Sequence, residues 1–326
     1  MRILIVKLSS LGDVVQTMPV VADILAVHPD AQIDWVVEEA FASLLERVIG
    51  VRRVIPIGLR RWKKSWFAAS TRQARLAFKA DLQSTKYDVV MDCQGLIKSA
   101  LVARLASLTE HGLRGSFANQ SDACGYEWPV KFLLPNNQAM PRRIHAVART
   151  RLLAAKLLGY QFRDAPQVAF HNLPARTSFP NQVMLTHGTT RQDNEWPLHS
   201  WEKLAEWLIQ QGTEQILLPH ANERELRVCE AIAQHIGSSA FILPRMGLSE
   251  LLDAMAMCQG VIGVDSGLSH MAVALGLPHV QIFSHDRAWR AGPVDTAYQL
   301  AVGGEQAPSV QDVIAAWSKV TASFAK

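Results

Sequence analysis

The stretch that most constrains the fold runs from Gly260 to Pro278 and reads GVIGVDSGLSHMAVALGLP. Its first residues are small or β-branched and apolar, as a buried strand requires, and its last ones repeat apolar residues at helical spacing. Between them lies a polar turn, Asp265 to Gly267, so unpaired N–H groups at the helix start face whatever lies above the turn. Because such a helix end attracts phosphate, the stretch predicts a strand, an anion-binding turn and a helix of a parallel α/β sheet.

The polar residues of this turn have two interpretations. Asp265 and Ser266 are good N-cap residues and His270 can be a packing histidine, which would make the turn purely structural. Alternatively, the Asp265 carboxylate holds ligand hydroxyls, and His270 adds a hydrogen-bond donor beside an anion site. The combination of strand, acidic turn, glycine and histidine favours ligand binding.

Strand-like and helix-like segments alternate along the chain, which is typical of parallel sheets covered by helices on both faces. With 326 residues the chain suits two domains of roughly 150 residues each. A proline-rich polar stretch after Tyr160 is the best linker. We therefore expect an α/β protein with a first domain over 1–165, a second over 166–308, and a C-terminal helix over 309–326 that packs back on the first domain.

Composition and motif spacing argue against several classes of protein. Charged residues make up 19% of the chain and apolar residues 49%, as in compact soluble α/β proteins. The turn after the first strand has one glycine where a dinucleotide-binding fingerprint needs three, which counts against a nicotinamide dehydrogenase. The formal net charge of +4 is too small to indicate DNA binding.

Cysteine usage and hydropathy indicate a cytoplasmic protein. The four cysteines are widely spaced and lack zinc-type spacing, so they are expected to be reduced thiols: Cys93, Cys124, Cys229 and Cys258. Only four apolar residues stand between Arg2 and Lys7, too few for the core of a signal peptide, and no run of about eighteen apolar residues is present. We expect a protein that is not inserted in a bilayer but can touch one.

A short polar turn over residues 9–13 separates the first strand from the first helix. In open α/β sheets ligands lie at the carboxyl ends of strands, so this turn is expected to face a ligand. Asp13 can cap the helix or act as a general base, and the residues alone support both roles equally. A second strand, turn and helix over Asp92–Ser99 adds Lys98 near a helix start.

Six cations and three aromatic rings are interleaved between Arg52 and Phe67. A charge run is usually a solvated face. Arginines beside rings also suit an acceptor that carries carboxylates or phosphates next to sugar or acyl surface, because guanidinium pairs bidentately with such anions. Nucleic acid would fit the same residues, but no recognisable nucleic-acid motif accompanies them, so no nucleic-acid partner is expected.

Several motifs taken together resemble those of the ADP-heptose:lipopolysaccharide heptosyltransferases, glycosyltransferase family 9, over nearly the whole chain. The resemblance is carried by Lys7–Val14, Arg60–Phe67, Asp92–Ser99, His145–Thr150, Thr189–Arg191 with Trp196 and Pro197, and Val264–His270. It implies a GT-B fold, in which two Rossmann-like parallel-sheet domains face each other across a cleft. It also implies inverting, metal-independent transfer of L-glycero-D-manno-heptose from ADP-L-glycero-β-D-manno-heptose to the inner Kdo of Kdo-lipid A, in inner-core lipopolysaccharide biosynthesis of a Gram-negative bacterium.

The resemblance also implies roles for individual residues. Asp13 is similar to the base that removes the proton from the Kdo hydroxyl. The implied acceptor-binding residues of the first domain are Ser10, Gly12, Arg60, Arg61, Lys63, Lys64, Gln94 and Lys98. The implied donor-binding residues of the second domain are Thr189, Thr190, Arg191, Asn194, Glu223, Met246, Asp265, Ser266, Gly267, Leu268 and His270.

Within the donor set, the threonine pair and the residues from Ser266 to His270 resemble a pyrophosphate clamp. Asp265 would hold heptose hydroxyls, while Glu223 and Met246 resemble ribose and adenine contacts. The sequence departs from the family pattern at Asn194, where a lysine is usual. The Arg-Glu-Pro segment of the family is also not recognisable in the first domain.

The partners that the resemblance implies are ADP-heptose, the Kdo-lipid A acceptor and the cytoplasmic membrane surface. It implies no cofactor, and we expect a monomer associated peripherally with the inner face of the inner membrane. Trp62, Trp66 and Phe67 are expected to rest in the membrane interface. Two alternatives stay open: a related heptosyltransferase with another core-sugar or anionic acceptor, and a nucleotide- or polyanion-binding protein without catalysis.

Overall fold

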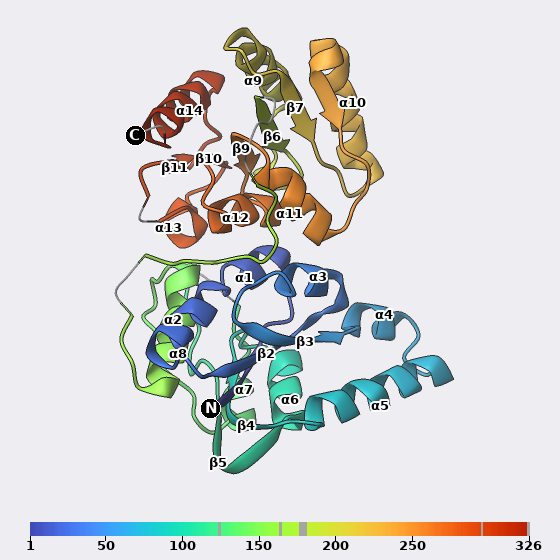
Figure 1. Ribbon diagram of the computed structural model, residues 1–326, viewed down its shortest axis with the longest axis vertical. Coiled ribbons are helices and arrows are strands. Elements are labelled where there is room, and N and C mark those ends of the chain that lie inside the picture. Colours follow the sequence, from blue (N-terminus) through green and yellow to red (C-terminus); the bar gives the residue numbers. More distant parts are fainter. Residues whose placement is uncertain (123–124, 163–164, 176–180, 295, 325–326) are drawn as a thin grey trace. The chain divides into compact units, whose positions relative to one another are not determined.

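The computed structural model describes residues 1–122, 125–162, 165–175, 181–294 and 296–324. The chain divides into two compact units, Met1–His171 and Asn172–Lys326, and each contains one parallel sheet with helices packed on it (Figure 1). The division falls within the proline-rich stretch after Tyr160.

The first unit is built on a five-stranded sheet in the order β3-β2-β1-β4-β5. Its strands are β1 (Arg2–Val6), β2 (Gln32–Glu38), β3 (Val51–Ile57), β4 (Lys86–Asp92) and β5 (Ser107–Gly115). Ile5 of the central strand pairs with Trp35 of β2 on one side and with Met91 of β4 on the other. Because neighbouring strands are parallel, the loops that follow β1 to β4 gather at one edge of the sheet.

Helices cover both faces of this sheet. They are α1 (Leu11–Val15), α2 (Pro19–Val27), α3 (Ala42–Leu45), α4 (Leu59–Lys64), α5 (Ala69–Gln83), α6 (Ile97–Leu105), α7 (Val130–Leu133) and α8 (Ala146–Leu158), with a 3-10 turn η1 (Glu39–Phe41). Leu4 and Val6 share a core with residues of α4 to α7. Ile3 and Ile5 point to the other face because strand side chains alternate, and α2 and α8 pack together there.

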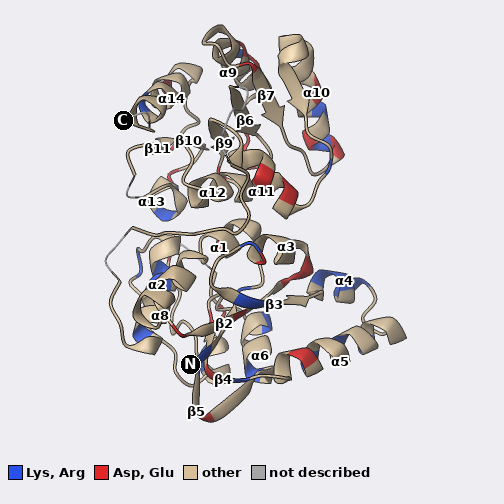
Figure 2. Ribbon diagram, in the orientation of Figure 1, with Lys and Arg blue, Asp and Glu red and all other residues tan. Residues whose placement is uncertain are grey.

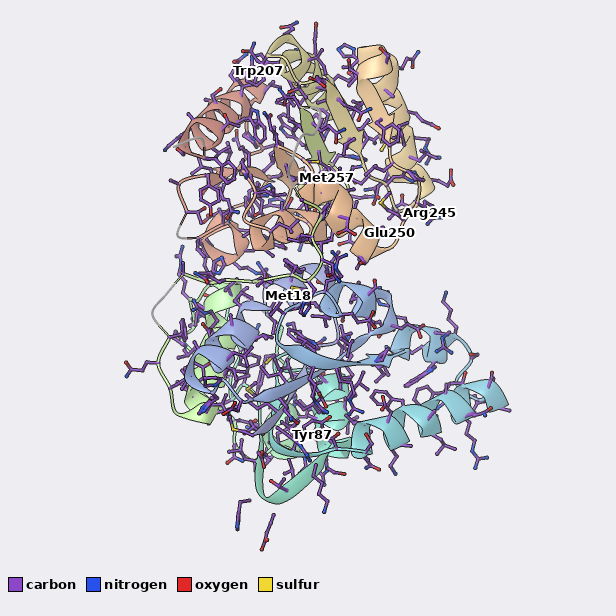
Figure 3. All side chains as sticks on the ribbon, viewed as in Figure 1. Met18, Tyr87, Trp207, Arg245, Glu250 and Met257 are labelled. Carbon is purple, nitrogen blue, oxygen red and sulfur yellow. The ribbon has the colours of Figure 1, made fainter. Side chains whose placement is uncertain are left out.

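Two features of the first unit differ from the sequence-based expectation. The apolar spacing of residues 14–27 predicts one helix, but this segment belongs to two helices, because Pro19 lacks an N–H and begins α2 after the buried Met18, labelled in Figure 3. The expectation that Trp62 rests in a membrane interface is wrong. Its ring is buried edge-on against Phe78, with 5.8 Å between ring centroids.

The second unit is built on a six-stranded sheet in the order β11-β10-β9-β6-β7-β8. Its strands are β6 (Gln182–Thr186), β7 (Gln215–Leu218), β8 (Ala240–Ile242), β9 (Gly260–Val264), β10 (His279–Phe283) and β11 (Gln299–Gly303). Its helices are α9 (Leu198–Gln210), α10 (Glu223–Ile236), α11 (Leu248–Ala256), α12 (Gly267–Ala274), α13 (Ala288–Ala291) and α14 (Val310–Phe324), with 3-10 turns η2 (Gln192–Asn194) and η3 (Gly237–Ser239). The strand and helix predicted on either side of Asp265 are therefore β9 and α12.

The C-terminal helix packs within the second unit, and its packing on the first domain stays a prediction. Val313, Trp317 and Val320 of α14 belong to the hydrophobic core of the second unit, and α14 packs on β10, β11 and α9. Gly260 makes this packing possible, because a Cβ at that position would lie 2.6 Å from the Trp317 ring. The apolar stripe of α14 thus covers the sheet of its own unit.

Three of the cysteines are buried thiols, at Cys93, Cys229 and Cys258, and Cys124 lies outside the described residues. Burial raises the pKa of the Cys93 thiol to about 12. Among the helices of the described ranges, none is long and apolar enough to cross a membrane.

Candidate active site

The candidate site of the first unit lies where β1 leads into α1. The Oδ2 atom of Asp13 accepts hydrogen bonds from the Ser10 N–H (2.9 Å) and the Ser10 hydroxyl (2.7 Å), which forms a capping box at the start of α1. The Asp13 side chain is nevertheless 33% exposed, so a substrate hydroxyl can reach it. The observed geometry therefore allows Asp13 both to cap α1 and to act as a general base.

A buried lysine stands beside this carboxylate. The Lys7 Nζ lies 3.9 Å from Asp13 Oδ1 and donates a hydrogen bond to the Cys93 carbonyl at 3.2 Å. Lys7 was part of the motif in the sequence but was not selected as a site residue. Its position directly after an apolar strand indicates that its ammonium is buried. A buried ammonium needs an anion or carbonyls around it, so a nearby carboxylate could have been expected.

The loop after β4 joins the same edge of the sheet. The Oε1 atom of Gln94 accepts the Leu8 N–H at 2.8 Å, and Lys98 Nζ donates to the Ser9 hydroxyl at 3.3 Å. Burial, followed by the nearby charge of Lys63, lowers the pKa of the Lys98 ammonium. The fold thus brings two acceptor-binding candidates, Gln94 and Lys98, to the β1 turn that carries Ser10, Gly12 and Asp13.

The basic residues of α4 follow β3, at the same edge, and Figure 2 shows this helix as a basic segment. The Arg60 N–H donates to Glu38 Oε1 at 2.8 Å. Arg61 holds Glu39 in a two-point ion pair, with both N–O distances at 3.0 Å, and this contact lowers the pKa of the Glu39 carboxyl. Lys63 and Lys64 are exposed. An anionic acceptor group near Arg61 would therefore meet a guanidinium that already pairs with Glu39.

In the second unit, the polar residues of the turn between β9 and α12 have different roles. Ser266 is the N-cap of α12, and its hydroxyl accepts the Ser269 N–H at 3.5 Å. Asp265 accepts a hydrogen bond from Gln281 Nε2 at 3.0 Å and lies 3.4 Å from His270 Nε2. The purely capping interpretation of Asp265 is therefore wrong, because Ser266 caps the helix.

The charge of Asp265 is stabilised by its surroundings. Burial would raise the pKa of its carboxyl, but the hydrogen bond and charge of His270, with smaller effects of Arg290 and Gln281, hold that pKa below its usual range. Gly267 and Leu268 form the first positions of α12. The turn therefore presents an ionised carboxylate beside a helix N-terminus, as recognition of a hydroxylated phosphate compound requires.

The loop after β6 carries the threonine pair. The Thr189 hydroxyl accepts the Arg191 N–H at 3.3 Å, and Arg191 forms a two-point ion pair with Asp193. This pairing lowers the pKa of the Asp193 carboxyl to about 2. Thr190 is exposed, whereas Asn194 is buried in η2, where its amide brings no charge.

The loop from β10 to α13 supplies cations that the sequence analysis overlooked. His285 Nε2 lies 3.3 Å from Asp193 Oδ2, and the charges of Arg287 and Arg290 act on Asp193 and Asp265 respectively. The basic colour of α13 is visible in Figure 2. The signal was present, since β10 is parallel to β9 and its loop must emerge at the same edge.

The predicted ribose contact, Glu223, is exposed in the first turn of α10. The carboxylate that borders the β6 loop is instead Glu225, because a Cβ on Gly188 would lie 2.8 Å from its Cδ. Helix α10 starts at Asn222, whose side chain accepts the Arg224 and Glu225 N–H groups. The ribose contact at Glu223 stays a prediction, and Glu225, two positions further along α10, is the carboxylate that lies beside the β6 loop.

The predicted adenine contact, Met246, is half-buried in the loop between β8 and α11. The preceding residue, Arg245, donates a hydrogen bond to the Ala221 carbonyl and so ties this loop to the one before α10; Figure 3 labels its side chain. The hydrogen bond thereby connects the loops after β7 and β8 at the carboxyl edge of the second sheet, where the loop after β6 also lies.

These features define a two-domain α/β enzyme that handles oxygen-rich, anionic substrates, and comparisons with known proteins specify the family. The sequence model of glycosyltransferase family 9 (heptosyltransferase) matches residues 75–313. The chain is 39% identical over 294 residues to lipopolysaccharide heptosyltransferase 1 of Escherichia coli (strain K12), covering 87% of this chain and 88% of that protein. It is 34% identical over 316 residues to lipopolysaccharide heptosyltransferase 1 of Pseudomonas aeruginosa, covering 94% and 82%.

The fold is also that of a solved heptosyltransferase. The structure of E. coli heptosyltransferase WaaC with ADP-2-deoxy-2-fluoro heptose superimposes with a TM-score of 0.80, at 33% identity and with both chains fully covered. The structure of the same enzyme with ADP gives a TM-score of 0.81 over 97% of each chain. The chain belongs to glycosyltransferase family 9, and it is a GT-B glycosyltransferase of the heptosyltransferase type. Family membership favours an enzyme over a binding protein without catalysis.

Proposed function

We propose that this enzyme transfers L-glycero-D-manno-heptose from ADP-heptose to the inner Kdo of Kdo-lipid A, during assembly of the lipopolysaccharide inner core. The shared name of the relatives, lipopolysaccharide heptosyltransferase 1, supports the reaction. The observation that carries the proposal is the Asp13 carboxylate, which is oriented by Ser10, flanked by Lys7 and open to solvent at the carboxyl edge of the first sheet.

In the proposed step, Asp13 accepts the proton of the Kdo hydroxyl while the oxygen of that hydroxyl attacks the anomeric carbon of heptose. The new glycosidic C–O bond forms as the bond to the diphosphate breaks, and ADP leaves with the electron pair. A single displacement of this kind inverts the configuration at the anomeric carbon. Arg60, Arg61, Lys63 and Lys64 bind the acceptor anions, because they lie at the same sheet edge as the base.

The second unit holds the donor in this proposal. The N-terminus of α12 and the Thr189 loop bind the diphosphate, and Asp265 accepts hydrogen bonds from heptose hydroxyls. Arg191 and Arg290 supply positive charge near these groups, where charge develops on the departing ADP. We propose that the enzyme works without a metal, and saturating EDTA is therefore expected to leave kcat unchanged.

The enzyme is proposed to act at the inner face of the cytoplasmic membrane, where a lipid-linked acceptor is available. Phe67 is 97% exposed at the end of the basic α4 segment, which supports contact with an anionic surface. The test of the function is incubation with ADP-heptose and Kdo-lipid A, read by mass spectrometry of the lipid and by ADP release. A heptose added to Kdo-lipid A is the expected result. ADP release only with a different core acceptor would contradict the acceptor assignment.

A further inference from the structure

The outward side of α6 is apolar where a surface helix is usually polar. Ile97, Leu101 and Leu105 are 37%, 47% and 40% exposed, and their spacing of four residues places them on one side of the helix. The opposite side is already used, since Ala100 and Ala103 are buried in the core of the first unit. Helix α6 therefore has two apolar sides, and only one of them packs on the sheet.

Two large rings extend this apolar side. Trp128 is 66% and Phe132 is 70% exposed, and their centroids lie 5.9 Å apart in an edge-to-face pair. Helices α6 and α7 pack together, and the Ile97 N–H donates to the Glu127 carboxylate at 2.6 Å (Figure 1). We call the surface formed by Ile97, Leu101, Leu105, Trp128 and Phe132 the α6–α7 face.

Cations surround the α6–α7 face. Lys131 Nζ lies 4.9 Å from the centre of the Phe132 ring, and Arg104 is exposed beside Leu101 and Leu105 on α6. The neighbouring acid, Glu127, accepts a hydrogen bond from the start of α6. The adjoining segment over residues 59–83 carries seven Lys and Arg residues and one acid, although the whole chain has a net charge of only +4. Helix α5 of this segment contacts α6, so positive charge also borders this apolar surface on the α5 side.

We propose that the α6–α7 face is a docking surface for an anionic phospholipid bilayer. Exposed rings and aliphatic side chains flanked by cations match the acyl boundary and head groups of such a bilayer. A second copy of the same face is a poorer partner, because two-fold pairing would oppose like charges across the contact. The proposal rests on the proposed function, since it is the lipid-linked acceptor that gives the enzyme a reason to bind a membrane.

The position of the face agrees with the acceptor site. Ile97 begins α6, and the next residue, Lys98, reaches the Ser9 hydroxyl in the loop that carries Asp13. The apolar stripe therefore starts at the acceptor-binding edge of the sheet and runs away from it along α6. An enzyme docked by this face would keep the head group of a membrane lipid near Asp13 while the acyl chains stay in the bilayer.

The test is co-sedimentation of the full chain with vesicles of zwitterionic lipid containing anionic phosphatidylglycerol. We expect Trp128→Ser with Phe132→Ser to weaken binding by at least about tenfold, because the variant loses two rings that would be buried in the interface. The matched control is Phe241→Ser, which removes a ring that is 46% exposed on β8 of the second unit and should leave binding unchanged. Leu101→Gln, on the other helix, provides an independent variant of the same face.

The cations give a second, separable measurement. Arg104→Gln and Lys131→Gln should each weaken binding to anionic vesicles by about fivefold, and added salt should reduce this difference. On purely zwitterionic vesicles the ring variant should still be weaker than wild type, whereas the cation variants should match it. Unchanged binding of the ring variant and of Leu101→Gln would overturn the proposal. So would a concentration-dependent dimer that these changes dissociate, in a protein that does not sediment with vesicles.

A soluble acceptor distinguishes failure of this inference from failure of the proposed function. With a deacylated Kdo-glucosamine disaccharide the ring variant should transfer heptose like wild type, because no membrane is involved. If wild type itself does not use this acceptor or Kdo-lipid A, the proposed function fails, and the sedimentation result still decides whether the face binds lipid.

Discussion

The ammonium of Lys7 lies 3.9 Å from Oδ1 of Asp13, while Oδ2 of the same carboxylate accepts both hydrogen bonds from Ser10. The two oxygens of Asp13 therefore have different surroundings. Ser10 engages Oδ2 as part of the helix cap, and we expect the acceptor hydroxyl to approach Oδ1. The buried charge of Lys7 also balances the carboxylate before the acceptor arrives.

Asp13→Asn should remove most of kcat and leave the Kd for ADP-heptose nearly unchanged. The amide keeps the shape of the side chain but cannot take a proton, and loss of general-base catalysis typically costs roughly 10²- to 10⁴-fold. Asp312→Asn is the matched control, because Asp312 accepts the same two hydrogen bonds from Ser309 at the start of α14, and this variant should keep the kcat of wild type. The assignment fails if the Asn variant turns over within a few-fold of wild type under conditions where chemistry limits the rate.

Asp265→Ala should weaken ADP-heptose binding more than ADP binding. The carboxylate is held by Gln281 and His270 and does not cap the helix, so its expected partners are hydroxyls of the sugar. Isothermal calorimetry with both ligands measures the difference. Ser266→Ala, which removes the observed cap, should instead weaken the binding of both ligands equally or lower only the stability of the protein. Equal losses of affinity for ADP and ADP-heptose in Asp265→Ala would argue for a structural role of Asp265.

Arg60→Ala combined with Arg61→Ala should raise KM for the lipid acceptor and leave KM for ADP-heptose almost unchanged. Each cation removed near an anionic surface should cost about 1 kcal/mol, and added salt should narrow the gap to wild type. Lys203→Ala, at an exposed position on α9 of the second unit, serves as the control for general loss of charge. Steady-state kinetics at two salt concentrations measure both KM values. If the basic segment is only a solvated face, neither KM changes. If the segment binds the donor, KM for ADP-heptose rises instead.

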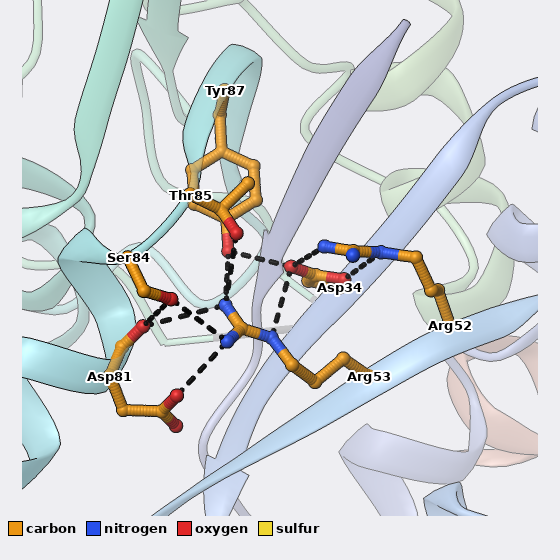
Figure 4. A network of polar contacts seen from close by, with 7 residues as sticks. All are labelled: Asp34, Arg52, Arg53, Asp81, Ser84, Thr85 and Tyr87. Atoms are coloured by element: carbon orange, nitrogen blue, oxygen red, sulfur yellow. Dashed lines mark hydrogen bonds and ion pairs between the residues drawn. The ribbon is translucent and has the colours of Figure 1, made fainter.

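The polar network around Asp34 should support stability without affecting catalysis. The buried Asp34 carboxylate accepts hydrogen bonds from Arg52, Arg53 and the Tyr87 hydroxyl, as shown in Figure 4. Burial, followed by the Asp34 contact, raises the pKa of Tyr87 to about 12, so the hydroxyl stays a donor. Asp34→Ala should cost about 3 kcal/mol of unfolding free energy and Tyr87→Phe about 1.5 kcal/mol.

These two variants are measured by urea unfolding and by kcat at a temperature where both are folded. The network lies in the amino-terminal halves of β2, β3 and β4, away from the edge that carries Asp13. A fall in kcat of the folded Tyr87→Phe enzyme by more than a few-fold would contradict this separation of stability from catalysis.

His279 should make the second unit sensitive to acid. Its ring is fully buried, Nδ1 donates to the Val261 carbonyl at 2.9 Å, and burial lowers its pKa to about 3. Below about pH 6.5 the unfolded chain binds a proton that the folded chain excludes, so acid favours unfolding down to about pH 3. The contribution to the slope is at most about 1.4 kcal/mol per pH unit.

The measurement compares unfolding free energies of wild type and His279→Gln at pH 7 and pH 5. The variant should lose less stability on acidification than wild type. Part of the pH dependence of the unfolding free energy should remain, because burial also lowers the pKa of His187. Parallel pH dependences in the two proteins would show that His279 does not contribute.

Local sequence patterns predicted the central strands and the ligand-facing turns because these depend on nearest neighbours. Short apolar runs predict strands over residues 182–186, 215–218 and 279–283, and these are the bounds of β6, β7 and β10. Helices α4 and α5 were not predicted, because their charge run has no clear apolar stripe. Only packing against Phe78 and the β-sheet makes Trp62 a core residue.

The sequence by itself determined the α/β class and the positions of the strand-to-helix turns that carry Asp265 and the candidate base Asp13, because each rests on residues that are adjacent in the chain. Tertiary structure alone decided which residues from different loops meet: Lys7 with Asp13, Glu225 with the β6 loop, and His285 after β10 with Asp193. It also decided that α14 covers its own sheet. The physical reason is that parallel pairing brings the ends of strands far apart in sequence to one edge, and no local pattern records which side chains then come into contact.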